Sequence, residues 1–87
     1  MVEVKKFGAS WCGPCRALAP ILTEIKSQFN NVLFTEHDVD DDYEEATKYE
    51  IRSVPTVILI KDGVEVDRII GLAAKSKYVG LINEQTN

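Results

Sequence analysis

Cys12 and Cys15 are the only two cysteines of the chain, and two residues separate them. Thiolates are nucleophiles and metal ligands, so this pair fits either disulfide exchange or part of a metal site. Two cysteines one helical turn apart can reach disulfide distance, whereas a bridge closing so short a loop would stabilise the fold little. A zinc site would need more ligands than this pair and His37, the only histidine, can supply. These residue types favour redox chemistry, and we expect no bound metal.

A strand and a helix must position this pair. Residues 2–7 are rich in β-forming residues and are followed by Gly8 and a loop of small residues, which predicts a strand. Apolar residues then recur at helical spacing, at Leu18, Leu22, Ile25 and Phe29. This pattern predicts an amphipathic helix from Cys12 to about residue 30, kinked at Pro20. The unpaired N–H groups and the dipole at its start should lower the pKa of the Cys12 thiol.

The remaining elements follow from periodicity and turn residues. We expect a strand at 32–39, a short helix at 43–49 with N-cap candidates Asp40, Asp41 and Asp42, a strand buried on both faces at 57–60, a hairpin turn at Asp62 and Gly63, a partly exposed strand to residue 70 and a helix around 78–82 with a fraying tail. The order β-α-β-α-β-β-α predicts an α/β fold in one domain, residues 1–87. Its four-stranded mixed sheet, mostly parallel, should be flanked by three helices.

The charge balance narrows the classes of partner. Ten basic and fourteen acidic side chains give a net charge of −4, which disfavours binding to nucleic acid or to an anionic membrane surface. No stretch near the start has the apolar length of a signal peptide, and the apolar run at 57–60 cannot cross a bilayer. We therefore expect a cytoplasmic protein, and we expect it to be monomeric.

Several motifs together resemble the thioredoxin family. They are the WCGPC segment at residues 11–15, Ala19 and Pro20 within the helix, Val54 and Pro55 before the buried strand, and Gly71 after the last strand. The resemblance covers nearly the whole chain, although the family's N-terminal strand and helix are missing. It implies a minimal thioredoxin fold, a compact core that is also seen in glutaredoxins.

The resemblance implies a thiol-disulfide oxidoreductase that reduces protein disulfides, with no bound cofactor beyond a redox-active Cys12–Cys15 disulfide. Cys12 would be the nucleophile and Cys15 the resolving thiol. The substrate-binding surface would comprise Trp11, Gly13, Pro14, Val54, Pro55 and Gly71, with Pro55 as the family's cis-proline. Electrons would come from thioredoxin reductase and go to clients such as ribonucleotide reductase. A Gly-rich dinucleotide fingerprint is absent from the sequence.

Two positions depart from the family pattern. Lys6 stands where thioredoxins usually bury an aspartate, and Glu36 stands where they commonly carry a lysine. A charge in a central strand needs a partner or water, so Lys6 and Glu36 either pair or lie at wet strand ends. One hypothesis is that Glu36, or a water that it orients, accepts the proton of Cys15. Gly8 replaces a frequent aromatic residue, and we expect a more open surface beside Cys12.

Two alternatives remain open. A glutaredoxin-like, glutathione-dependent reductase would suit the short N-terminus and Gly8, but Gly13 and Pro14 replace the Pro-Tyr common in that family. A non-catalytic binding subunit could also use the fold, although both cysteines are intact. Gly-Pro between the cysteines resembles the reducing members of the family.

Overall fold

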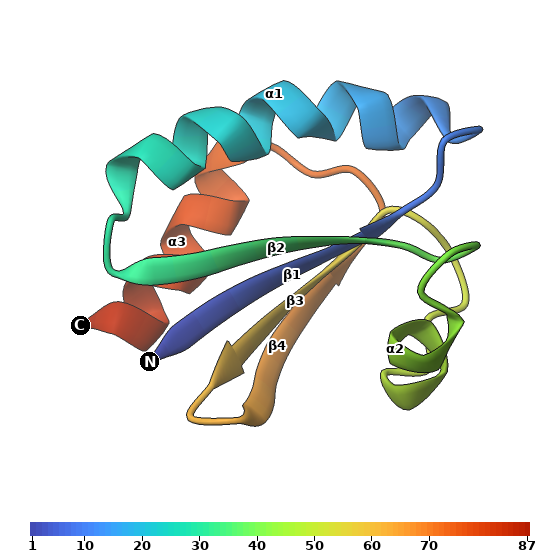
Figure 1. Cartoon of the computed structure of the whole chain (residues 1–87). Coiled ribbons are helices and arrows are strands. Elements are labelled where there is room, and N and C mark those ends of the chain that lie inside the picture. Colours follow the sequence, from blue (N-terminus) through green and yellow to red (C-terminus); the bar gives the residue numbers. More distant parts are fainter.

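Seven elements follow one another in the predicted order, and the computed structural model describes all 87 residues (Figure 1). They are β1 (Val2–Gly8), α1 (Gly13–Gln28), β2 (Val32–Asp38), α2 (Tyr43–Lys48), β3 (Thr56–Lys61), β4 (Val64–Ile70) and α3 (Lys75–Thr86). The α/β class is therefore confirmed, and the predicted boundaries differ from these mainly at the ends of elements.

The four strands form one mixed sheet in the order β2-β1-β3-β4. β1 and β2 are parallel, whereas β1 and β3, and β3 and β4, are antiparallel. The expectation of a mostly parallel sheet is therefore wrong. A parallel return needs a crossover about as long as a strand, and the six residues of α2 rise only about 9 Å. The chain consequently re-enters the sheet at the end where β2 leaves it (Figure 1).

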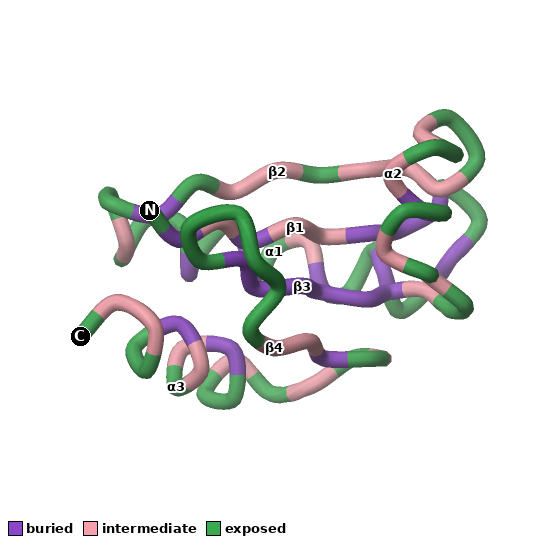
Figure 2. Tube along the Cα trace, turned by 90° about the horizontal axis from the view of Figure 1, so that it is seen from below, coloured by how far each residue is buried: buried purple, intermediate pink, exposed green.

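The helices divide between the two faces of the sheet. α1 and α3 share a core of eleven buried residues with one face, and Leu18, Leu22 and Ile25 of α1 pack there with Tyr78 and Ile82 of α3. The other face, beside α2, has a core of only four buried residues. β1 and β3 are the inner strands, and β3 is buried on both faces as predicted (Figure 2). The larger core therefore fixes α1, whose start carries the cysteines.

Helix α1 follows the prediction to within two residues at each end, whereas α3 extends beyond it. α1 continues through Pro20 to Gln28, and its first turn places Cys15 among its buried residues. α3 reaches Thr86, so the expectation of a fraying tail is wrong. The hydroxyl of Thr86 donates to the carbonyl oxygen of Ile82 at 2.9 Å, and this bond ties the last turn of α3 to a buried residue.

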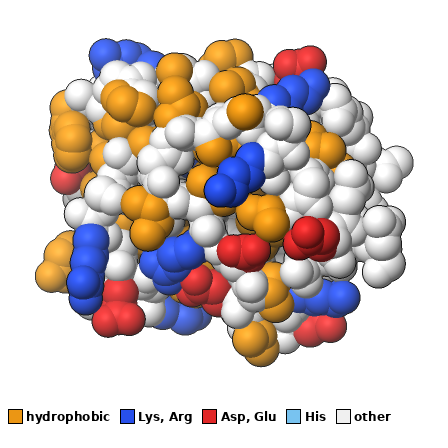
Figure 3. Space-filling model, turned by 180° about the vertical axis from the view of Figure 1, so that it is seen from behind, with side chains coloured by type: hydrophobic (Ala, Val, Ile, Leu, Met, Phe, Trp, Pro, Cys, Tyr) orange, Lys and Arg blue, Asp and Glu red, His pale blue; other side chains and the backbone are white.

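The hairpin between β3 and β4 is confirmed. Asp62 and Gly63 have φ angles of 52° and 84°, the left-handed geometry that a two-residue hairpin turn requires. Seen from behind, hydrophobic side chains show at many points of the surface, and most of the charged side chains gather in its lower half (Figure 3). No helix has the length and apolar character needed to cross a membrane.

Candidate active site

Cys12 and Cys15 form a disulfide at the N-terminus of α1, where the sequence places them. Their Cα atoms are 5.3 Å apart. Cys12 is the N-cap residue, and the backbone N–H of Cys15 donates to its Sγ at 3.1 Å. Pro14 lies in the first turn, where a helix has no partner for its N–H in any case. One of the helix's free donors thus points at the sulfur that would carry a negative charge after reduction.

The disulfide lies in a small apolar cluster. Cys12 and Cys15 are 5% and 4% exposed, and they pack with Ala9. Val54, which precedes the cis peptide bond to Pro55, packs against this cluster. The N–H of Gly71 donates to the carbonyl oxygen of Pro55 at 2.8 Å. The structure therefore brings Val54, Pro55 and Gly71, which are far apart in sequence from the cysteines, to the same place.

An exposed rim borders the buried sulfurs. Gly13 and Pro14 are exposed, and 67% of Trp11 is accessible to solvent. The indole Nε1 of Trp11 donates to Oδ2 of Asp40 at 2.9 Å, which links the loop before α1 to the loop after β2. Asp40 was expected only as a possible helix cap, and no sequence pattern indicates its contact with Trp11.

Lys6 and Glu36 form an ion pair, with 3.7 Å between Nζ and Oε1. Their environments differ, because the Lys6 side chain is 11% exposed and that of Glu36 is 73% exposed. Lys6 also donates from Nζ to the carbonyl oxygen of Cys15 at 3.4 Å. Both residues line a cavity of about 340 Å³ together with Cys15. The alternative in which both residues lie separately at wet strand ends is therefore wrong, because Lys6 points into the protein.

Gly8 opens space at a different cysteine from the one expected. A Cβ atom on Gly8 would lie 3.4 Å from Sγ of Cys15. The open space is therefore beside Cys15 and not beside Cys12. Gly8 and Lys6 lie two residues apart on β1, so both face α1, and Gly8 contributes to the same cavity as Lys6.

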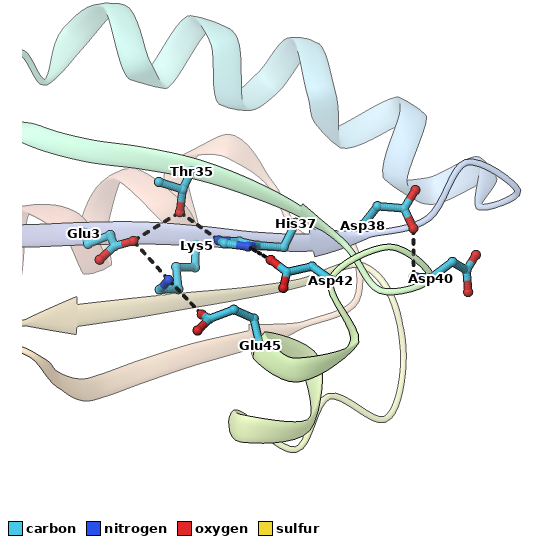
Figure 4. A network of polar contacts seen from close by, with 8 residues as sticks. All are labelled: Glu3, Lys5, Thr35, His37, Asp38, Asp40, Asp42 and Glu45. Carbon is cyan, nitrogen blue, oxygen red and sulfur yellow. Dashed lines mark hydrogen bonds and ion pairs between the residues drawn. The ribbon is translucent and has the colours of Figure 1, made fainter.

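His37 belongs to a polar network on the opposite face of the sheet (Figure 4). Its Nδ1 lies 2.7 Å from Oδ2 of Asp42, and its Nε2 lies 3.1 Å from the hydroxyl of Thr35. The hydrogen bond with His37 lowers the pKa of Asp42, whose carboxylate makes no side-chain cap to α2. Nowhere in the chain do three His, Cys, Asp or Glu side chains converge in an arrangement that could hold a metal ion.

The same network holds Lys5 between Glu3 and Glu45, at 3.3 and 3.0 Å from its Nζ (Figure 4). Burial by itself lowers the pKa of Lys5, but hydrogen bonds with Glu45 and Glu3 outweigh that effect and raise it. The hydrogen bond from Lys5 correspondingly lowers the pKa of Glu45. The network therefore joins β1, β2 and α2 on the face away from the disulfide.

Tyr78 supports the site from α3. Its hydroxyl accepts a hydrogen bond from the N–H of Ala73 at 3.1 Å and lies 3.5 Å from the carbonyl oxygen of Gly71. Burial raises the pKa of this phenol. The sequence placed Tyr78 only on the apolar face of a helix, although a buried tyrosine hydroxyl needs a polar partner.

Comparisons with known proteins agree with this geometry. The family model described as Thioredoxin matches residues 2–84. A thioredoxin of Chlamydia caviae is 42% identical over 80 residues, which are 92% of this chain and 78% of that protein. A thioredoxin of Staphylococcus aureus is 36% identical over 84 residues, 95% of this chain and 81% of the relative.

Solved structures show the same similarity. The crystal structure of Fasciola hepatica thioredoxin superposes with a TM-score of 0.91 at 40% sequence identity, covering 98% of this chain and 81% of that one. The fold, the cysteine pair and these relatives favour neither the glutaredoxin-like reductase nor the non-catalytic subunit. The chain belongs to the thioredoxin family and is a thiol-disulfide oxidoreductase.

Proposed function

We propose that Cys12 and Cys15 divide the reduction of a client disulfide into two steps. The Cys12 thiolate attacks one client sulfur, the client disulfide breaks, and a mixed disulfide forms while the other client sulfur leaves. Cys15 then loses its proton and attacks Sγ of Cys12, which releases the second client thiolate. The client gains two electrons and the chain ends as its Cys12–Cys15 disulfide. The observation that carries this assignment is the Cys15 N–H pointing at Cys12 Sγ at 3.1 Å.

The substrate-binding rim would form around the disulfide. Trp11, Gly13 and Pro14 would contact the client from one side, since all three are exposed. Val54 and Pro55 would lie on the other side, and Val54 would offer its backbone to an extended client segment. Gly71 would complete the rim, since its N–H bonds to Pro55 at 2.8 Å and its φ of 86° suits glycine.

Glu36 is the proposed proton acceptor for Cys15 during release. Its carboxylate is accessible to water, and Glu36 and Cys15 line the same cavity. Water in that cavity would carry the proton from the sulfur to Glu36, so that no direct contact is required. Lys6, 3.7 Å from Glu36, would hold the carboxylate in place as its ion-pair partner.

A trapping experiment tests the division of labour between the cysteines. In Cys15→Ser the first attack by Cys12 remains possible but release by Cys15 does not. We therefore expect a stable mixed disulfide with a disulfide-containing test protein such as insulin. Cys12→Ser is the matched control and should trap almost none, because Cys15 lacks the helix N–H that Cys12 accepts and that favours a thiolate. Mass spectrometry under non-reducing conditions gives the yield. Equal trapping by both variants would contradict the assigned roles.

Stopped-flow kinetics tests Glu36. In Glu36→Gln we expect release of the mixed disulfide to slow by about a hundredfold, at the low end of the usual contribution of a general base, while the Cys12 attack is nearly unchanged. Glu44→Gln serves as the control, because it removes an exposed carboxylate of α2 on the other face of the sheet. An unchanged release rate would exclude Glu36 from the mechanism.

The wider context of the reaction follows from family membership. The family implies a thioredoxin reductase as electron source and disulfide-containing proteins as clients, with the chain's own disulfide as its only redox group. We propose in addition that ribonucleotide reductase is among the clients, and that the chain works as a cytoplasmic monomer in electron transport and redox homeostasis. The single domain proposed for residues 1–87 would carry the whole cycle.

A further inference from the structure

Lys6 is a largely buried cation beside Cys15. Its Nζ lies 3.4 Å from the carbonyl oxygen of Cys15, and only 11% of its side chain is exposed. The Cβ position of Gly8 is 3.6 Å from Cε of Lys6 and 3.4 Å from Sγ of Cys15. These two distances limit the separation between Lys6 Cε and the sulfur to about 7 Å. The absence of a side chain at Gly8 leaves the space between them open.

The other charged groups around this cavity are engaged elsewhere. Arg16 of α1 donates to the carbonyl oxygen of Ser10 at 3.0 Å, and the Asp38 carboxylate of β2 accepts from the N–H of Asp40 at 2.8 Å. The imidazole of His37 bonds to Asp42 on the opposite face. On its other side Lys6 lines a cavity with Glu36 and with Lys26 of α1, and of these only Glu36 pairs with it. The exposed carboxylate of Glu36 is surrounded by water that screens its charge. Lys6 is therefore the charged side chain of this cavity that bonds to Cys15 itself.

We infer that the Lys6 ammonium stabilises the thiolate of Cys15 and thereby sets the redox poise of the pair. During release, the Cys15 proton passes through the cavity to Glu36 or to water, and the thiolate forms beside a fixed positive charge. The thiolate then attacks Cys12 Sγ, and the client sulfur leaves with the electron pair of the broken bond. Lys6 itself exchanges no proton and is a positioning residue. This inference rests on the proposed function of the two cysteines.

The consequence for redox poise has a definite sign. The charge acts on the reduced protein when Cys15 is ionised and has no thiolate to act on in the disulfide. Stabilising the reduced form makes a dithiol pair a weaker reductant and a stronger oxidant. The contribution is complete where Cys15 is ionised and fades as the pH falls and the sulfur is protonated. Lys6 should therefore make the chain less reducing at alkaline pH than the same chain without this cation.

The test compares the reduction potentials of Lys6→Met and the wild type by titration against glutathione redox buffers. The titrations are done at about pH 9 and at about pH 6, above and below the ordinary pKa of a cysteine thiol. At about pH 9 we expect the equilibrium constant for exchange with glutathione to favour the oxidised form about tenfold more in the variant than in the wild type. This corresponds to a reduction potential about 30 mV more negative for the variant. At about pH 6 the two proteins should agree within about twofold. The pH profile of Cys15 alkylation in a Cys12→Ser background should move to higher pH in the variant.

Three further measurements separate this effect from a disturbance of the fold. Lys26→Met removes the same charge farther along α1 and should leave the potential unchanged, and Lys6→Arg should restore it. A purely structural role would lower the free energies of unfolding of the oxidised and reduced forms equally, whereas our inference requires a larger loss in the reduced form. Lys6→Gln replaces Lys6→Met if the latter does not fold.

The possible failures are distinguishable. A wild-type chain that did not cycle with protein disulfides would contradict the proposed function as a whole. A wild-type chain that cycles, together with equal potentials and alkylation profiles for wild type, Lys6→Met and Lys6→Gln at about pH 9, would overturn only the role of Lys6.

Discussion

The two cysteines have different surroundings although three positions along one helix separate them. Cys12 caps the helix and accepts the N–H of Cys15. Cys15 lies one turn further in, against Gly8 and near Lys6 of β1. A sulfur that accepts a helix N–H suits the role of an attacking thiolate, whereas a sulfur beside a cavity and a largely buried cation suits a thiol that ionises only during release.

Lys5 and Lys6 show how one residue type serves two purposes in adjacent positions. Successive side chains of a strand point to opposite faces of the sheet. Lys5 therefore pairs with Glu3 and Glu45 beside α2, and Lys6 reaches Cys15 beneath α1. Lys5 links elements of the fold, and Lys6 lies next to a cysteine of the disulfide.

The Lys5–Glu45 pair gives a pH-dependent prediction. The hydrogen bond from Lys5 holds the pKa of Glu45 below its ordinary 4.5, so its stabilisation is present above that pH and lost as the pH falls through the folded value. Glu45→Gln should lower the free energy of unfolding at pH 7 by about 0.5–1 kcal/mol and have a smaller effect near about pH 3. Urea unfolding at both pH values measures this.

Glu44→Gln is the control for that pair, because Glu44 shares the first turn of α2 and makes no ion pair. Subtracting its effect removes the contribution of the helix dipole. A destabilisation of Glu45→Gln that stayed the same at both pH values would show that packing, and not the ion pair, is responsible.

At the scale of elements, the loop between β4 and α3 is held from both of its sides. Gly71 bonds through its N–H to Pro55, and Ala73 bonds to the hydroxyl of Tyr78. Helix α3 therefore holds the loop that carries Gly71, a residue of the proposed rim, from outside the disulfide cluster. The position of Gly71 depends on the packing of α3 against the sheet.

Tyr78→Phe tests this support. The change leaves the partly buried N–H of Ala73 without its partner, which should lower the free energy of unfolding by about 1 kcal/mol. A looser Gly71 segment should raise KM for a protein disulfide by about threefold and leave kcat unchanged. A threefold change corresponds to a loss of binding free energy no larger than that of one hydrogen bond. Tyr43→Phe removes an exposed hydroxyl and should change neither quantity. An unaltered KM in Tyr78→Phe would show that α3 does not support the rim.

At the scale of the whole molecule, the two faces of the sheet carry different groups of side chains. The face beneath α1 and α3 carries the larger apolar core and, at its end, the disulfide and its cavity. The face beside α2 joins a smaller apolar core to the network of Lys5, Thr35 and His37. The inner strands β1 and β3 hold the two faces in register, so the disulfide and Pro55 meet at one end of the sheet.

The sequence by itself determined the order of the elements, the place of Cys12 and Cys15 at a helix start, the burial of β3 and the hairpin at Asp62 and Gly63. Each depends on residues close together in the chain: apolar periodicity, a turn pair with glycine, or a proline and two cysteines within one helical turn. The thioredoxin motifs added the association of Pro55 and Gly71 with the cysteines.

Only the tertiary structure decided that β3 runs antiparallel to β1, that α3 continues to Thr86, and that Gly8 and Lys6 face Cys15. These features depend on which strands become neighbours and in what register, and so on contacts between residues far apart in the chain. A shift of one residue in register turns a side chain to the other face of the sheet. The sequence alone could therefore not predict the direction of the Lys6 side chain, and with it the charge beside the sulfur of Cys15. That direction follows only from the position of β1 beneath α1.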